Sequence, residues 1–342
     1  MALAYVQTRR ETTSAPGNES VTPTYASAVL FPPALSVNAQ LNPSPLMRDD
    51  EIRNIDEPLS IVPESHAPEW SIESRMYPNT IGHLLTNMLG APTTTAGNGV
   101  ITDPDTVAIP VGAHRHVWTA PFAAGAIPTT FDMRLAYRDQ GVFYQAKGCA
   151  TSSMAITSPE SGGARVSASG PALFFARISD PALSPSYEAL TVLPFMRRHL
   201  TLTWLSGSAT TEDFSLNISN PVETVRSLGI ASGFPDVVEK AETPVTFTGS
   251  IPKRQLDETD YDALLNSTGF TATARWVSSS IIASAYPYKL FVQFANCQYT
   301  GGQIGALENR RRIGASFDFK GTTTGSAGHV TITLVNATSS MA

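Results

Sequence analysis

Charged residues are scarce in this chain of 342 residues: Asp, Glu, Lys and Arg make up 15% of it, against about 25% in typical soluble domains. The balance is acidic, with a formal net charge of −6. A protein that holds nucleic acid through phosphate contacts needs a basic face, so the composition argues against such a binder. It leaves open a surface past which nucleic acid slides, because a mildly acidic wall repels phosphate.

Cysteine is nearly absent too. Cys149 and Cys297 are too few for a disulfide-built scaffold or a cysteine-based zinc site, and we interpret them as buried thiols. No run approaches ~20 apolar residues, so we expect no membrane span. The first ten residues lack the basic start and apolar run of a signal peptide. We therefore expect the chain to be made and kept in a cytoplasm until it assembles.

Motifs that carry catalysis are missing from the sequence: it has no Gly-x-Ser-x-Gly, no phosphate-binding glycine loop and no His-Glu-x-x-His. His114 and His116 share a strand face and could bind zinc, but no other ligand stands at a suitable spacing, so we favour a surface strand. The acidic residues of 257–262 could serve glycoside hydrolysis, but the N-terminus of a helix explains them more simply. We predict no catalytic site, no metal site and no cofactor.

What the chain does contain favours an all-β fold with little helix. Its 24 glycines and 25 prolines suit many short strands joined by turns. Two helices are expected, one from the N-cap Asn79 to Gly90, the other carrying a Thr259/Asp262 capping box, a buried Leu264–Leu265 stripe and a stop at Gly269. Alternating apolar residues predict strands at about 70–74, 114–119, 130–138, 142–157, 163–170, 199–205, 214–218, 243–251, 270–278, 288–299, 313–319 and 330–334.

The order of these elements repeats along the chain. Leu84-Leu85 in the first helix corresponds to Leu264-Leu265 in the second, 180 residues later, and Cys149 corresponds to Cys297 after 148 residues. The difference of 32 residues matches the longer connection 91–130 that follows the first helix. We therefore predict an extended N-terminal arm over 1–57, where the composition cannot build a core by itself, and two duplicated β domains over 58–190 and 191–342. Such modules commonly stack or form rings.

Basic residues gather in two places, at Arg197 and Arg198 and at Arg310, Arg311 and Arg312. Runs of this kind are often solvated faces. In an assembly they also meet acidic patches on a neighbouring copy, where they set register and specificity. We name these five arginines as candidate inter-subunit contacts.

Several strings stand in a characteristic order and spacing along the chain. They are 70–74 (Trp-Ser-Ile-Glu-Ser), 84–90 (Leu-Leu-Thr-Asn-Met-Leu-Gly), 114–119 (His-Arg-His-Val-Trp-Thr), 143–149 (Phe-Tyr-Gln-Ala-Lys-Gly-Cys) and 215–220 (Ser-Leu-Asn-Ile-Ser-Asn). Through this order and spacing, more than through any one string, the chain resembles the tail tube proteins of long-tailed bacteriophages from about residue 58 to 335.

The resemblance implies a β-sandwich with one flanking helix, here present twice, in a structural protein without enzymatic activity. It implies rings whose inner sheets join into a barrel, and stacking of these rings into a hollow virion tail tube, assembled in the host cytoplasm, through which DNA passes without specific binding. Tail terminator, tape measure and distal tail proteins are the implied partners. The duplication predicts three chains per ring with pseudo-sixfold symmetry, with a hexamer as the fallback.

Other interpretations stay open. A tail terminator, distal tail or baseplate protein would share the fold. A carbohydrate-binding β-sandwich of a fibre would need exposed aromatic residues on one face. The four tryptophans (Trp70, Trp118, Trp204 and Trp276) instead lie inside predicted strands in which apolar and polar residues alternate. A β-rich glycosidase is a more distant alternative.

Overall fold

The computed structural model describes most of the chain. It covers residues 4–10, 30–31, 34–46, 62–119, 130–137, 140–159, 162–180, 186–187, 191–205, 207–209, 213–225, 234–235, 237–241, 244–253, 258–304, 315–322 and 330–341. We call the described residues up to 187 the first half and those from 191 the second half. The fold is mostly β with two α-helices, as the sequence predicts, and the described strands form no closed barrel within one chain.

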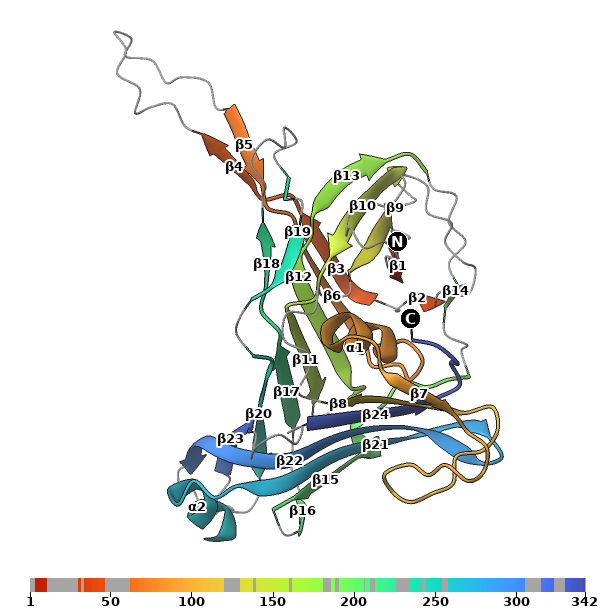
Figure 1. The fold of residues 1–342 in the computed structure, drawn as a ribbon, viewed down its shortest axis with the longest axis vertical. Coiled ribbons are helices and arrows are strands. Elements are labelled where there is room, and N and C mark those ends of the chain that lie inside the picture. The colour runs from red at the N-terminus through yellow and green to blue at the C-terminus, as the bar shows by residue number, and fades with distance from the viewer. Residues whose placement is uncertain are drawn as a thin grey trace.

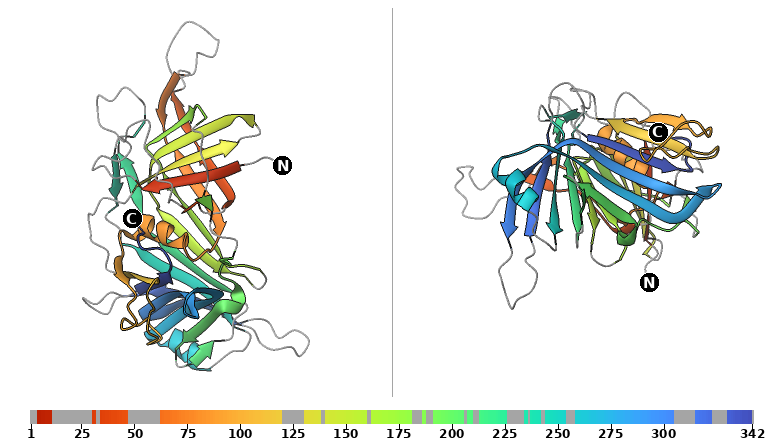
Figure 2. Two further views of the ribbon diagram at one scale, coloured as in Figure 1. Left: turned by 90° about the vertical axis from the view of Figure 1, so that its right-hand side faces the viewer. Right: turned by 90° about the horizontal axis from the view of Figure 1, so that it is seen from below.

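One large sheet of 14 strands runs through both halves, and Figures 1 and 2 show its strands side by side. Its order is β16 (Gly207–Ala209), β15 (Leu200–Trp204), β21 (Phe270–Ala283), β22 (Tyr286–Ile304), β23 (Ala315–Gly321), β20 (Thr246–Lys253), β17 (Phe214–Ser219), β11 (Ser153–Ser158), β12 (Arg165–Pro171), β6 (Glu69–Arg75) and β3 (Ala34–Gln40). A branch leaves it at β22, through β24 (Val330–Asn336), β8 (His114–Thr119) and β7 (Thr93–Ala96).

A second sheet belongs to the first half alone, with the order β1 (Ala4–Arg10), β9 (Phe131–Tyr137), β10 (Val142–Cys149) and β13 (Phe174–Ile178). Three small pairs complete the strands: β2 (Leu30–Phe31) with β14 (Ser186–Tyr187), β4 (Pro43–Leu46) with β5 (Val62–His66), and β18 (Val222–Val225) with β19 (Val237–Lys240). Strands β1 to β4 thus fall inside 1–57, the segment predicted to be an arm.

The strand pairings of the first half recur in the second. In the first half β1 pairs with β9, β3 with β6, β6 with β12, β11 with β12, β9 with β10 and β10 with β13. In the second half the matching pairs are β15 with β21, β17 with β20, β20 with β23, the last part of β22 with β23, β21 with β22, and the first part of β22 with β24. The first half differs by the β7–β8 insertion, which falls in the predicted longer connection.

The two cysteines occupy matching places in this scheme. Cys149 lies opposite Phe131 across β10 and β9, and Cys297 lies opposite Phe270 across β22 and β21. Each pair sits beside a register shift in its strands. Both thiols are buried and neither forms a disulfide, as the sequence predicts.

Helix α1 (Ile81–Leu89) lies between the β9–β10 sheet and the β8–β24 strands (Figure 1), and every residue of it except His83 is buried. Gly90 ends it with a φ of 89°, a conformation that favours glycine. Thr80, not the predicted Asn79, holds the N-cap position, without a side-chain cap. The Asn79 side chain is used elsewhere, since its Oδ1 accepts a hydrogen bond from the backbone N–H of Ala337 at 3.3 Å.

Helix α2 (Glu258–Leu265) differs from its prediction. It begins before Thr259, which therefore cannot cap it, and a left-handed Ser267 (φ 49°) follows its end ahead of Gly269. The predicted leucine stripe is wrong at Leu265, which is 63% exposed, whereas Leu264 is half-buried and packs against the core. The buried residues of α2 are Asp260 and Ala263. A polar contact also attaches the helix: Tyr299 Oη donates a 2.6 Å hydrogen bond to Asp260 Oδ1.

One hydrophobic core serves both halves. Trp70 and Leu85 of the first half belong to the same buried cluster as Trp204 and Phe319 of the second. All four tryptophans are at most 2% exposed. Burying a large side chain contributes about 1.5–3 kcal/mol, so this shared core gives the two halves a common source of stability.

Candidate assembly interface

Strands β11 and β17 join the two halves through an antiparallel ladder, which we call the internal joint. On its buried face, Met154 lies opposite Ile218 and Ile156 opposite Leu216. All four side chains have 0% exposure. The joint is therefore a continuous piece of sheet with a closed apolar face.

The opposite face of this sheet, which we call the polar face, is lined by short uncharged side chains that are exposed or half-buried. They are Ser36, Asn38, Gln40, Ser71, Ser153, Thr157, Ser167, Ser169, Ser215, Asn217, Ser219, Thr246, Thr248 and Ser250. Among the charged residues of this face, Glu73 and Arg165 pair at 3.0 Å, and Asp318 lies two positions from Lys320. Glu69 and Arg75 of β6 also lie on this face. Its charges are thus of both signs.

Within the described residues, several edges of the large sheet lack a partner strand, among them β16 and β7. We call two others the open edges. The first is β3, which is hydrogen-bonded to β6 only. The second is residues 298–304 of β22, which pair with β23 only, because the pairing with β21 ends at Cys297 and that with β24 at Phe294. An unpaired edge presents backbone N–H and C=O groups that can template another strand.

The second half covers α1. Asn220, which follows β17, donates a hydrogen bond from Nδ2 to the backbone oxygen of Met88 at 2.9 Å. At Gly82, a Cβ would lie 2.3 Å from Sδ of Met341, so the C-terminal segment packs closely on α1. Helix α2 has no such cover among the described residues: Leu265 is 63% and Tyr261 is 41% exposed.

A charged cluster ties the insertion of the first half to the β21–β22 hairpin of the second. Lys289 Nζ lies 2.6 Å from Asp103 and 3.1 Å from Asp105, and Arg275 pairs with Asp105 at 2.7 Å. Tyr286 Oη also donates to Asp103. Burial alone would raise the pKa of Asp103, but the hydrogen bonds from Lys289 and Tyr286 outweigh it and lower that pKa below its usual value. The pKa of Tyr286 rises, first because it is buried and then because it donates to Asp103.

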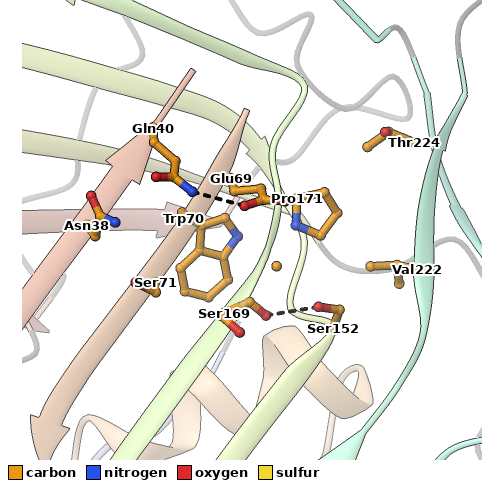
Figure 3. A pocket seen from close by; sticks show the side chains of 11 residues that line it. Asn38, Gln40, Glu69, Trp70, Ser71, Ser152, Ser169, Pro171, Val222 and Thr224 are labelled. Carbon is orange, nitrogen blue, oxygen red and sulfur yellow. Dashed lines mark hydrogen bonds between the residues drawn. The ribbon is translucent and has the colours of Figure 1, made fainter. Parts of the chain in front are cut away.

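A polar pocket of about 430 Å³ lies where the two halves meet near β3 (Figure 3). Gln40, Glu69 and Trp70 face Val222 and Thr224 of β18 across it. Glu69 is the single carboxylate among the described residues that line it, and it accepts a 3.1 Å hydrogen bond from Gln40. Glycoside hydrolysis by a pair of carboxylates needs a second acid.

The predicted arginine contacts are only partly placed. Arg197 and Arg198 form the short 3₁₀ turn η2 (Arg197–His199), where Arg197 is half-buried and Arg198 is exposed. Burial, and then the charge of Arg198, lowers the pKa of His199. Arg310, Arg311 and Arg312 lie outside the described residues, so the role of both clusters stays a prediction.

The histidine pair of β8 does not form the surface strand that the sequence favoured, because His116 has 0% exposure. Its Nδ1 lies 2.9 Å from Thr94 Oγ1, and its Nε2 lies 3.0 Å from the backbone oxygen of Thr338. The described residues contain no group of three or more His, Cys, Asp or Glu that could hold a metal ion. His116 therefore serves packing between the insertion and the C-terminal segment.

Sequence reasoning missed the residues that connect the halves. Asp103 and Lys289 are 186 residues apart, and Met88 and Asn220 are 132 apart. Neither pair stands in a periodic pattern. The Asp-Pro-Asp run at 103–105 in a turn-rich loop was the available signal, and it could not name the partner.

A mostly β fold with a polar sheet face and open strand edges is typical of structural proteins that associate through their strands. In agreement with this, the family described as "Phage tail tube protein" matches residues 1–321. The chain belongs to the phage tail tube protein family, and is thus a structural component of a virion tail. No curated protein matches the sequence. None of the helices in the described part of the chain is long and apolar enough to cross a membrane.

Proposed function

We propose that this protein forms rings by joining its open sheet edges, and that the rings stack into the hollow tail tube through which phage DNA reaches the host. The internal joint is the observation that carries this proposal. It demonstrates that a first-half edge and a second-half edge of this chain make a well-packed ladder. The two open edges, one in the first half at β3 and one in the second half at the end of β22, are a further pair of the same kind.

We further propose that the halves are tandem copies of one β-sandwich unit, each with one helix. The recurring pairings support this, as do the matching Cys149–Phe131 and Cys297–Phe270 positions. The strands of the first unit begin with β1, so we place the unit boundary near residue 190 and count β1 and β3 with the first unit. Three chains then supply six units, giving a trimeric ring with pseudo-sixfold symmetry.

The polar face is our candidate for the wall of the lumen. Its side chains are mostly serine, threonine, asparagine and glutamine, and acidic and basic residues are mixed among them. Such a wall offers no array of basic groups to hold phosphates, so DNA would slide without specific binding. In this role the protein has no catalytic step and needs no cofactor.

The tube would be capped and measured by other virion proteins: a tail terminator, a tape measure and a distal tail protein are the proposed partners. Assembly would take place in the host cytoplasm. Because closing the open edges removes exposed strand backbone, polymerisation would also protect the chain from irregular aggregation.

Negative-stain images of the purified protein, combined with native mass spectrometry, test the proposal. We expect rings and stacked tubes, with three chains in the smallest closed ring. Rings that stop at one or two layers would point to a tail terminator or distal tail protein. Monodisperse globules under all conditions would contradict the proposal.

A further inference from the structure

The two open edges match the two strands of the internal joint. In the pairing scheme, β11 of the first half holds the place of the last part of β22, since each pairs with the strand that follows it, β12 or β23. Likewise β3 holds the place of β17, since they pair with β6 and β20. The internal joint is therefore a template for how one chain meets the next.

The cysteines fix the alignment along the strands. Ala155 and Gln303 each follow the cysteine of their half, Cys149 or Cys297, by six residues. In the first half, one row of opposed residues crosses β11, β12, β6 and β3 and consists of Ser153, Ser169, Ser71 and Asn38. In the second half, the corresponding row crosses β22, β23, β20 and β17 and consists of Gly301, Asp318, Ser250 and Ser215. Asn38 therefore matches Ser215, and Gln40 matches Asn217. In the internal joint Asn217 lies opposite Ala155.

From this template we infer that residues 39–42 of one chain, at the end of β3, pair antiparallel with residues 301–304 of β22 in the next chain, with Gln40 opposite Gln303. This deepens the proposed function, on which it rests, by naming the two edges and their register. The partner is a second copy of this chain.

Burial along β3 supports the same partner. Val37 and Ala39 are half-buried and pack on the core from its margin. Their counterparts Phe214 and Leu216 are 1% and 0% exposed, because β11 lies beside them. A strand on the open edge of β3 would complete the burial in the same way.

The other open edge, at the end of β22, also lies beside apolar side chains that are incompletely buried. Leu264 of α2 packs against Gly302, where a Cβ would lie 2.9 Å from Leu264 Cδ2. The next residue, Leu265 at the end of the helix, is 63% exposed. Its counterpart α1 is covered by the following half, through Asn220 and Met341. A neighbouring chain docked on β22 would bring its first half over α2.

Disulfide trapping tests the register in the full-length protein. The double variant Gln40→Cys/Gln303→Cys should form intermolecular disulfides on mild oxidation, because opposed side chains in an antiparallel pair have Cβ atoms about 5 Å apart. Non-reducing gels should show a ladder that ends at three chains. Interference from the native thiols is small, since burial raises the pKa of Cys297 to about 12 and Cys149 is buried.

Matched variants make the result specific. Ala155→Cys/Asn217→Cys, at the internal joint, should form its disulfide within one chain and give no ladder. Ser36→Cys/Gln303→Cys, displaced by four residues or about 13 Å along β3, should stay monomeric, as should each single variant.

Images of the parent protein separate this inference from the proposed function. Rings in the parent, with no more cross-linking in Gln40→Cys/Gln303→Cys than in the displaced pair, would overturn the register and leave the ring proposal standing. A parent protein without rings or tubes overturns both. A ladder that ends at six chains would confirm the edges and replace the trimer by a hexamer.

Discussion

The two helices hold the same place in their halves and differ in what surrounds them. Helix α1 lies in the middle of the molecule between two layers of strands, whereas α2 lies at its outer end beside β22 and β23 (Figures 1 and 2). Leu85 of α1 has 0% exposure, and Leu265 of α2 has 63%. The difference comes from the neighbour: α1 is followed along the sheet by another half, and α2 by none. In the proposed ring, the chain would thus contain one complete contact between units and the two surfaces of a second contact that forms between chains.

The largest effect is expected when a charge is placed on the exposed surface of α2. Leu265→Glu should leave the single chain folded, because the side chain is exposed. It should abolish ring formation, since an unpaired carboxylate buried in each joint costs several kcal/mol. Sedimentation velocity checks the result. Val100→Glu, at a loop residue that is 79% exposed, is the matched control and should assemble normally. Equal assembly of both variants would remove α2 from the joint.

The next largest effect is expected for the ion pairs between the β7–β8 insertion of the first half and the β21–β22 hairpin. Lys289→Ala leaves the fully buried carboxylate of Asp103 without its cation, which should lower the free energy of unfolding by about 3–5 kcal/mol. Adding Asp103→Asn should recover part of this loss. Arg165→Ala breaks an ion pair whose side chains are 54% and 35% exposed, so it should cost at most about 1 kcal/mol. Urea unfolding measures all three, and similar losses at Lys289 and Arg165 would contradict the buried cluster.

Truncating the two helices compares them directly in the unassembled chain. Leu85→Ala should lower the free energy of unfolding by about 2–5 kcal/mol, because it leaves a cavity in the shared core. Leu265→Ala should change it by no more than about 0.5 kcal/mol. Chemical denaturation at a protein concentration below that of assembly makes the measurement. A large effect of Leu265→Ala there would mean that α2 is already covered within one chain.

The smallest expected effect is a loss of folding stability at acidic pH. Burial, and then the nearby His116, lowers the pKa of His83 in α1, while burial also lowers the pKa of His116 itself. Both groups bind protons more readily when unfolded, so stability is complete above about pH 6.5 and is lost as the pH falls below it. Each unit of lowering corresponds to about 1.4 kcal/mol.

His83→Gln tests this acid effect. The variant should have the same melting temperature as the parent at pH 8. Between pH 8 and pH 5 its melting temperature should fall less than that of the parent, as recorded by differential scanning calorimetry. Parallel curves for the two proteins would show that His83 does not carry the effect. Helix α2 has no histidine, so no corresponding sensitivity is expected at the other end of the molecule.

Much of the fold could be predicted from the sequence, because strand alternation is a local signal. Phe214, Leu216 and Ile218 alternate with polar residues and are buried as expected. The α1 stripe was equally clear. At α2 the same Leu-Leu string misled at Leu265, because no described segment of the chain covers that side chain. Propensity cannot reveal such a dependence.

The assembly surfaces were beyond sequence reasoning for a different reason. Which edges stay open depends on pairings between distant strands, such as β8 with β24 and β11 with β17. The arginines at 197–198 and 310–312 were chosen for charge alone. The polar face, by contrast, could have been read from the serine and threonine positions that alternate with buried residues in β17 and β20.

The internal joint also bears on how fast a ring could close. Because β11 and β17 belong to one chain, their contact forms at the high effective concentration of an intramolecular encounter and does not weaken on dilution. In a ring of three chains, half of the six joints would exist before any two molecules collide. Closure would then need fewer diffusive encounters than a ring of six single-unit subunits, and its rate would depend less steeply on protein concentration.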